Sequence, residues 1–249
     1  MSFLSRLRYL TDRAIYELRG RKEGAIEIRS RAVLQSFLAD PGNPVFISFP
    51  RTGSHWIRMV MELYFERPSL ILVFYYPENR DYMAYHNHDL ELEIERENVL
   101  YLYRNPVPTI FSQLTYHLED PEDESRIRHW TDLYGRHLDK WLFEESFSRR
   151  KTVLRYERFR EDLAAEFEKI CTHYGSVLDP ARLAEADART RKEDVIERTK
   201  LDRHVVRRKA GYEASRQSFV ETRSGLVWEC LLHGRERLRE AFEPDEIPG

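Results

Sequence analysis

The 249-residue chain has little cysteine, no long apolar run and almost no net charge. Its two cysteines, Cys171 and Cys230, form no CxxC pair, which argues against a disulfide framework and favours a reducing compartment. No stretch approaches the roughly 20 apolar residues that span a bilayer. The formal net charge of −3 gives no global basic field, so nucleic acid is not an expected partner. These absences favour a cytoplasmic protein.

The N-terminal segment, Met1 to Lys22, combines apolar residues with arginines in a helical pattern. The arginines interrupt the apolar residues too often for a secretory signal. Two interpretations of this amphipathic segment stay open. Either it packs as a surface helix on the domain, or it makes a peripheral contact with a membrane, which would bring a lipid-linked acceptor near.

Hydrophobic residues make up 41% of the chain, which is enough for a large core. They recur as short apolar runs followed by helical periodicity. Strands are predicted at 45–49, 70–74, 99–103 and 152–156, and helices at 54–65, 106–117, 127–147 and 161–174. This alternation predicts an α/β fold with a parallel sheet covered on both faces, whose ligands bind where strands end and helices begin.

The chain is expected to form a single domain in three parts. A helical extension occupies residues 1–40, the α/β core with the binding motifs occupies 41–175, and a helical region occupies 176–249. In the last part, basic residues are concentrated at 198–209, just before Gly211. This basic stretch is either a solvated charged face or an anion-binding loop.

The segment Pro50–Trp56 (PRTGSHW) follows the first predicted strand and opens a helix. Its small residues, with Gly53 among them, expose backbone N–H groups at a helix N-terminus, where the helix dipole favours a bound phosphate or sulfate. Arg51 adds a permanent cation, and Thr52 and Ser54 add hydroxyl groups. The GxxxxGK[ST] signature of nucleoside-triphosphate enzymes is absent. The segment therefore predicts a phosphate-binding loop of another kind.

A second polar segment, Tyr103–Ser112 (YRNPVPTIFS), also lies where a predicted strand passes into a helix. Arg104 leaves the strand end, and Ser112 lies two turns along the helix at about 1.5 Å rise per residue. A guanidinium fork and a hydroxyl in this arrangement can close on one phosphate. The two segments together predict a ligand with two phosphate-like groups.

In this order and at these positions, the two segments resemble the sulfotransferases that use 3′-phosphoadenosine-5′-phosphosulfate (PAPS), in particular soluble bacterial members with arginine in the first loop. The resemblance implies a single α/β domain with a central parallel sheet flanked by helices, similar to the P-loop NTPase fold. It also implies that PAPS is the co-substrate, that 3′-phosphoadenosine 5′-phosphate (PAP) is the product, and that no metal is needed.

The resemblance assigns a role to each residue of the first loop. Arg51 would stabilise the bridging oxygen as it leaves, and Trp56 would stack on adenine. The 5′-phosphate would be held by four residues, Thr52, Gly53, Ser54 and His55. A core anchor for its own helix remains the alternative role of Trp56.

In the second segment, the resemblance implies that Arg104 and Ser112 bind the 3′-phosphate. Three further segments, all later in the chain, extend the resemblance. The segment Leu154–Phe159 (LRYERF) resembles the family's YED unit, which implies that Tyr156 touches the nucleotide, and YGRHLDKW at 134–141 resembles a helix segment that precedes this unit. The segment RKAG at 208–211 resembles the family's C-terminal Arg-Lys-Gly loop, which closes over the 3′-phosphate. Ala210 replaces the glycine and the following tryptophan is missing, so the register of this loop stays open among Arg207, Arg208 and Lys209.

Sulfuryl transfer requires an acceptor hydroxyl that loses its proton as it attacks sulfur, and histidine suits the role of base. The family places one at a strand end between the two phosphate motifs, where this chain has Tyr85–Asp89 (YHNHD). We prefer His88, because a His-Asp pair at this position is common in bacterial-type relatives, and His86 is the alternative. A zinc site is disfavoured because no third ligand with useful spacing is evident.

The sequence thus predicts transfer of a sulfuryl group from PAPS to a hydroxyl of a glycan, a glycolipid or a small metabolite. The aromatic segment 75–89 is able to stack on a sugar or to pack in the core. Two alternatives are a nucleotide-dependent kinase, for which the lysine and carboxylate set is lacking, and a catalytically silent nucleotide-binding protein. The dimerisation motif of the cytosolic branch is not recognisable near Phe219 to Glu229, so no oligomeric state is predicted.

Overall fold

The computed structural model describes residues 26–27, 31–146, 148–191, 193 and 211–247. Two sequence predictions lie outside these residues: the amphipathic segment Met1 to Lys22, and the basic loop with Arg207, Arg208 and Lys209. None of the described helices is long and apolar enough to cross a membrane.

Five parallel strands form the central sheet, in the order β3-β5-β2-β6-β7. In that order they are β3 (Ser69–Leu70), β5 (Ala84–Asn87), β2 (Val45–Ser48), β6 (Asn98–Tyr103) and β7 (Arg150–Arg155). A separate antiparallel pair joins β1 (Ile26–Glu27) to β4 (Leu72–Val73). The parallel sheet confirms the predicted fold class.

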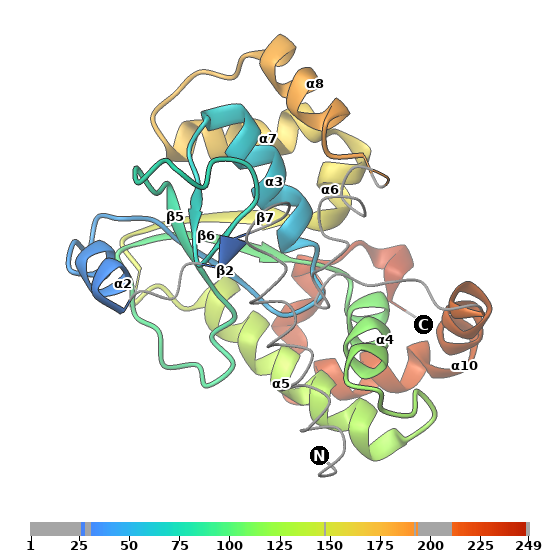
Figure 1. The fold of residues 1–249 in the computed structure, drawn as a ribbon. Coiled ribbons are helices and arrows are strands. Elements are labelled where there is room, and N and C mark those ends of the chain that lie inside the picture. The colour runs from blue at the N-terminus through green and yellow to red at the C-terminus, as the bar shows by residue number, and fades with distance from the viewer. Residues whose placement is uncertain (1–25, 28–30, 147, 192, 194–210, 248–249) are drawn as a thin grey trace, which may run out of the picture.

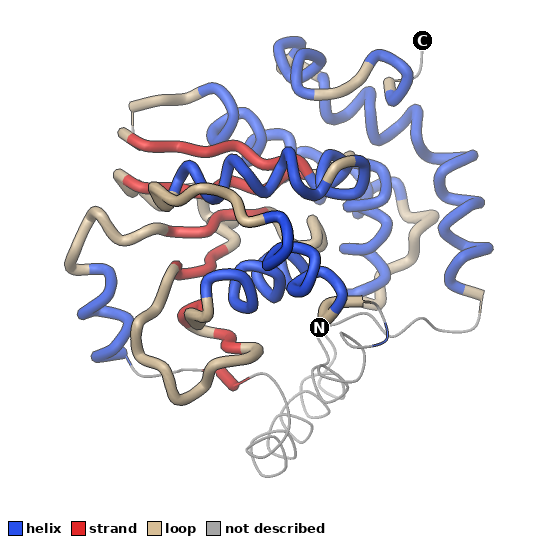
Figure 2. Tube along the Cα trace, turned by 90° about the horizontal axis from the view of Figure 1, so that it is seen from above, coloured by secondary structure: helices blue, strands red, loops and turns tan. Residues whose placement is uncertain are grey.

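Helices cover both faces of the sheet (Figure 1). One face carries α4 (Pro106–Tyr116), α5 (Glu124–Phe143) and α10 (Tyr212–Leu232), and the other carries α3 (Ser54–Phe65), α7 (Leu163–His173) and α8 (Pro180–Ala188). Figure 2 shows the strands side by side, with helices lying across them. The remaining helices are α2 (Arg31–Leu38), α6 (Tyr156–Glu161), η1 (Glu236–Ala241) and η2 (Pro244–Glu246).

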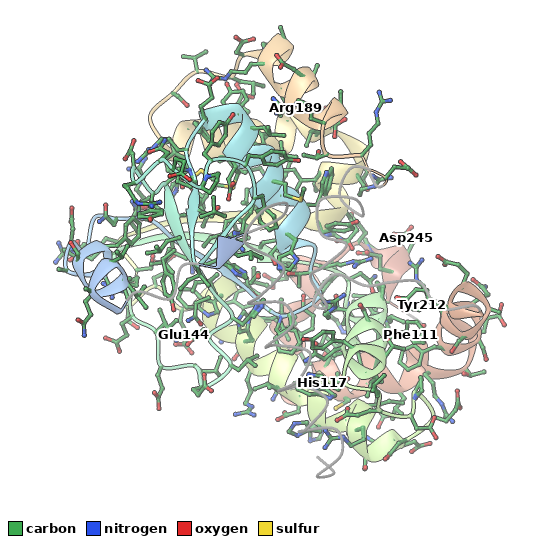
Figure 3. All side chains as sticks on the ribbon, in the orientation of Figure 1. Phe111, His117, Glu144, Arg189, Tyr212 and Asp245 are labelled. Carbon is green, nitrogen blue, oxygen red and sulfur yellow. The ribbon has the colours of Figure 1, made fainter. Side chains whose placement is uncertain are left out.

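The two core layers follow from the alternation of side chains along each strand. In β2, Val45 and Ile47 pack with α4, α5 and α10, whereas Phe46 packs with α3 and α7. All three side chains are fully buried. In the first layer, Phe111 of α4 and Tyr212 of α10 lie side by side in Figure 3, with ring centroids 5.3 Å apart.

Three elements differ from the sequence predictions. The predicted strand at 70–74 is divided between β3 and β4, because Ile71 has φ 89 and interrupts the extended backbone. The helix predicted at 161–174 is α7, which begins two residues later, at Leu163, since Asp162 ends α6 and caps α7 by accepting a hydrogen bond from the Ala165 N–H. Strand β5 was not predicted from periodicity, because its four residues AYHN show no apolar alternation.

Candidate functional site

The carboxyl ends of the parallel strands meet at one edge of the sheet. β2 ends at Ser48, β5 at Asn87, β6 at Tyr103 and β7 at Arg155. His86 lies within β5, and the other site residues that were predicted from the sequence and are described by the structure lie on the segments that follow these four ends. In open parallel sheets this edge is the usual place for a ligand.

The first loop turns sharply from β2 into α3. Arg51 and Gly53 have positive φ values of 70° and 93°, and Gly53 is the N-cap residue of α3. No side chain among the described residues caps this helix, so its first N–H groups suit an anion. The buried Thr52 hydroxyl donates to the Phe49 carbonyl at 2.8 Å, and this hydrogen bond stabilises the conformation of the loop.

Tyr156 packs directly on this loop. A Cβ atom built on Gly53 would lie 2.5 Å from two carbons of the Tyr156 ring. The same ring lies 4.4 Å from the Arg104 guanidinium and meets Trp56 edge-on at 6.0 Å. Glycine at position 53 is therefore required both by the backbone conformation and by the close approach of Tyr156.

The two predicted phosphate motifs are hydrogen-bonded to each other. Arg51 donates from Nε to the Ser112 hydroxyl at 3.1 Å, and Arg104 donates from Nη1 to the Arg51 carbonyl at 3.2 Å. The Arg51 guanidinium also lies 5.0 Å from the centre of the Tyr116 ring, one turn beyond Ser112 on α4. Two permanent cations and a hydroxyl, far apart in the sequence, thus converge beside the start of α3.

Trp56 and His55 lie on the first turn of α3. Trp56 donates from Nε1 to the Thr190 hydroxyl at 3.3 Å, and the Arg160 guanidinium lies 5.8 Å from its ring. The His55 ring meets Phe74 edge-on at 5.6 Å. Trp56 is partly exposed and packs against the core layer formed with α3, α7 and α8, as expected for a helix anchor.

Ser48, at the end of β2, contacts both candidate bases. Its hydroxyl shares a 3.1 Å hydrogen bond with His86 Nε2, and its carbonyl accepts a 2.6 Å hydrogen bond from His88 Nδ1. The two imidazole centroids are 4.7 Å apart. Because a carbonyl only accepts, the neutral His88 ring carries its proton on Nδ1 and its lone pair on Nε2.

The surroundings of His86 make it a weak base. Desolvation lowers the pKa of His86 well below its usual value, and the charge of Arg58 and the neighbouring His88 lower it further. His86 is therefore neutral at pH 7 and has little proton affinity to offer an acceptor. The tautomer of His88 and the depressed pKa of His86 both favour His88 as the base.

The carboxylate of Asp89 does not supply the orienting contact suggested by the His-Asp pair. Its Oδ2 accepts hydrogen bonds from Lys140 Nζ at 2.8 Å and Trp141 Nε1 at 3.0 Å, and its Oδ1 accepts from the Ile94 N–H at 2.9 Å. Asp89 therefore fixes the chain after His88, while the Ser48 carbonyl orients the imidazole itself.

No protein-family model matches the chain, and no curated protein matches it in sequence. Among solved structures, mouse sulfotransferase SULT7A1 complexed with PAP is similar, with a TM-score of 0.50 and 14% sequence identity. The match covers 84% of this chain and 91% of that chain. The chain has a sulfotransferase-like fold. At this identity the likeness concerns the arrangement of strands and helices, and the chemistry is argued from the residues.

Within this sulfotransferase-like fold, α5 contributes site residues that the sequence did not reveal. The Tyr134 hydroxyl donates to the Arg104 carbonyl at 2.6 Å and accepts from the Arg104 N–H at 3.0 Å. His137 donates from Nε2 to the His88 carbonyl at 3.0 Å and accepts from the Tyr101 hydroxyl at 3.0 Å. Burial lowers the pKa of His137 to about 3, so its ring is neutral. Both side chains are fully buried.

Acidic residues surround the backbone of the second motif. Glu157 accepts from the Asn105 N–H at 3.0 Å and lies 4.0 Å from Arg104 Nε. Glu246, in η2, accepts from the Asn105 side-chain amide at 3.0 Å and pairs with the buried Arg155. Burial raises the pKa of Glu157, while the Asn105 N–H and the charge of Arg104 oppose that shift. Sequence reasoning missed these contacts because they join β6, β7 and the C-terminal segment.

The described part of the site has no side-chain grouping typical of a metal ion. Within the part of the chain that the structure describes, no three His, Cys, Asp or Glu side chains are grouped so that they could hold a metal ion. The site is instead characterised by arginines, a helix N-terminus and neutral histidines.

Proposed function

We propose that the chain is a sulfotransferase that moves a sulfuryl group from PAPS to a hydroxyl of its acceptor. The observation that carries this proposal is the convergence of Arg51, Arg104 and Ser112 at the sheet edge that also holds His88. The sulfotransferase-like fold supports it, since the similar mouse enzyme was solved with PAP.

The described residues fit a ligand with two anionic groups. Arg51 and the start of α3 would take the 5′-phosphosulfate, and Arg104 with Ser112 would take the 3′-phosphate. The ring of Tyr156, which already contacts Gly53 and Arg104, would lie against the nucleotide. The basic loop with Arg207, Arg208 and Lys209 is proposed to complete the 3′-phosphate site.

The proposed reaction is an in-line displacement at sulfur. PAPS supplies the sulfuryl group, an S–O bond to the acceptor oxygen forms, and the S–O bond to the 5′-phosphate breaks. Arg51 stabilises the negative charge on the leaving oxygen, and the Ser112 hydroxyl holds its Nε. His88 takes the acceptor proton on Nε2, because its Nδ1 proton is held by the Ser48 carbonyl. The arginines supply the positive charge, so no metal is required.

We propose a glycan, a glycolipid or a small hydroxylated metabolite as acceptor, in that order, and a cytoplasmic location without nucleic-acid partners. The aromatic segment 75–89 supports a sugar acceptor only in part. Tyr82 is buried, Tyr85 accepts from the Asn87 amide at 2.7 Å, and Tyr75 donates to the Arg189 carbonyl at 3.2 Å. A peripheral membrane contact through the N-terminal segment would suit a glycolipid.

Thermal-shift measurements with PAP, with ATP and Mg²⁺, and with no ligand test the donor. The proposal expects stabilisation by PAP that persists in excess EDTA. Stabilisation by ATP and Mg²⁺ alone would instead identify a kinase. Stabilisation by PAP without sulfate transfer to any offered acceptor would identify a silent binder.

Substitutions then test the roles. We expect Arg51→Ala or Arg104→Ala to abolish transfer in a protein that still folds, and full activity in either variant would refute the site assignment. We expect His88→Ala to reduce transfer by about 10²- to 10⁴-fold while PAP binding persists. If His86→Ala alone produces that loss, then His86 is the base.

A further inference from the structure

One face of α5 carries four buried residues whose polar groups point to the two halves of the proposed site. They are Tyr134, His137, Lys140 and Trp141, which we call the α5 polar stripe. Their spacing of three, six and seven residues from Tyr134 places them along one side of the helix, over roughly 10 Å at 1.5 Å per residue. Ile127 and Leu138, which are also buried on α5, belong to the apolar core.

The first member of the stripe, Tyr134, contacts the donor side of the proposed site at Arg104. Through its hydroxyl, Tyr134 satisfies both backbone polar groups of Arg104, at 2.6 Å and 3.0 Å. Arg104 follows the last residue of β6, where the strand ladder no longer supplies those partners. The backbone of the proposed 3′-phosphate arginine is therefore anchored to α5.

The second member, His137, contacts the acceptor side of the proposed site at His88. His137 donates to the His88 carbonyl at 3.0 Å, and the Tyr101 hydroxyl fixes its other ring nitrogen at 3.0 Å. His137 and Tyr101 are both fully buried. Both ring nitrogens of His137 are thus engaged, and its Nε2–H contacts the backbone of the proposed base.

The last two members hold the residues that follow the base. Lys140 and Trp141 both donate to Asp89 Oδ2, and Lys140 also donates to the carbonyls of Leu92 and Ile94 at 2.8 Å and 2.9 Å. Asp89 has φ 43, an uncommon backbone conformation for a residue other than glycine. These contacts hold the turn that carries the chain away from His88.

We propose that the α5 polar stripe consists of positioning residues that set the distance between Arg104 on the donor side and His88 on the acceptor side. This inference rests on the proposed function. A helix is a rigid spacer, and in-line transfer requires the donor and the base to be held within about 0.5 Å of the productive geometry. The β-strands alone do not provide this, because Arg104 and His88 both lie beyond the last paired residues of β6 and β5.

The test compares two stripe variants with an exposed control on the same helix. Tyr134→Phe removes the donor-side anchor, and His137→Leu removes the acceptor-side anchor. Arg136→Ala changes an exposed residue whose partner is Asp132, one turn earlier. Calorimetry with PAP and with adenosine 5′-phosphate measures how strongly the 3′-phosphate is recognised, and ¹⁵N spectra of the histidines report the tautomer of His88.

The two stripe variants are expected to fail in different ways. In Tyr134→Phe, the unpaired Arg104 backbone lowers the preference for PAP over adenosine 5′-phosphate by about tenfold, while His88 keeps its Nδ1–H signal. In His137→Leu, the preference for PAP stays within about twofold of wild type, and His88 shows a mixture of tautomers. His137→Gln, whose amide reaches the position of Nε2, restores the single Nδ1–H signal.

Two results separate this inference from the proposed function. If the wild-type chain does not bind PAP, the proposed function and this inference are both wrong. If the wild-type chain binds PAP but both stripe variants behave like Arg136→Ala, only the inference is overturned. If His137→Leu does not fold, the spectrum of Tyr101→Phe decides, because the loss of the hydroxyl that fixes His137 predicts a mixture of His88 tautomers, whereas a merely structural role predicts an unchanged tautomer.

Discussion

Replacing Gly53 with alanine should destabilise the protein at the loop between β2 and α3. Gly53 is the N-cap residue of α3, has φ 93, and lies under the ring of Tyr156. The new Cβ would lie 2.5 Å from both Tyr156 Cδ2 and Cε2, a distance that requires the ring or the loop to move. Because the Tyr156 ring also contacts the Arg104 guanidinium at 4.4 Å, the displacement is expected to reach the second phosphate motif.

The structure provides a matched control for the backbone contribution. Gly211 is also an N-cap residue with positive φ, at 83°, but a Cβ there meets none of the described residues within 4 Å. Gly211→Ala should therefore cost only the left-handed backbone conformation, about 1–2 kcal/mol. Gly53→Ala adds the overpacking of the Tyr156 ring, about 1–3 kcal/mol more. For a chain of this size, that difference corresponds to a melting temperature lower by roughly 2–12 °C.

Thermal melts of the two variants and calorimetry with PAP measure these effects. We expect Gly53→Ala to melt below Gly211→Ala and to lose PAP binding. The double variant Gly53→Ala/Tyr156→Ala should recover part of the stability difference, because it removes the ring that the Cβ strikes. The reasoning is refuted if Gly53→Ala and Gly211→Ala are equally stable, or if removing the ring recovers nothing.

Two further predictions concern buried ionisable groups. Burial, with the charge of Arg150, lowers the pKa of His173 to about 4, so the unfolded chain binds a proton from pH 6.5 downward while the folded chain does not. His173 alone should therefore lower the stability by about 3 kcal/mol between pH 6.5 and 4, so urea titrations should show a shallower loss in His173→Gln; equal losses would contradict this. Arg58→Leu should cost about 3–5 kcal/mol in the same assay, because it leaves the Glu62 carboxylate buried without its neighbouring cation. A loss below about 1 kcal/mol would show that Arg58 is not needed.

The fold could be predicted to a large extent because its signals are local. The helix predicted at 54–65 has those bounds in α3, since an N-terminal loop signal precedes a strongly periodic segment. Asn105 acts as the N-cap of α4 by accepting from the Val107 N–H, as an Asn-Pro pair before a helix favours. Cys171 is fully buried in α7, as its apolar helical neighbours in the sequence favour. Each of these depends on residues within a few positions in the chain.

The candidate site could be predicted only as separate pieces. Arg51, Arg104 and Ser112 were recognised in their own segments, but the 3.1 Å contact of Arg51 with Ser112 joins residues 61 positions apart. Tyr134 and His137 lie within the helix predicted at 127–147, and both are fully buried. Periodicity carries no information about which backbone groups a buried hydroxyl or imidazole will reach.

The sequence by itself determined the order of strands and helices and the two arginine motifs, because strand–loop–helix patterns and cap residues act over a few positions. Only the tertiary structure decided the strand order, which places β2 between β5 and β6. That order brings His88 to the Ser48 carbonyl and the Asp89 carboxylate to Lys140. The pairing of parallel strands is a long-range choice, made by the packing of both faces of the sheet, and the protonated nitrogen of His88 follows from it.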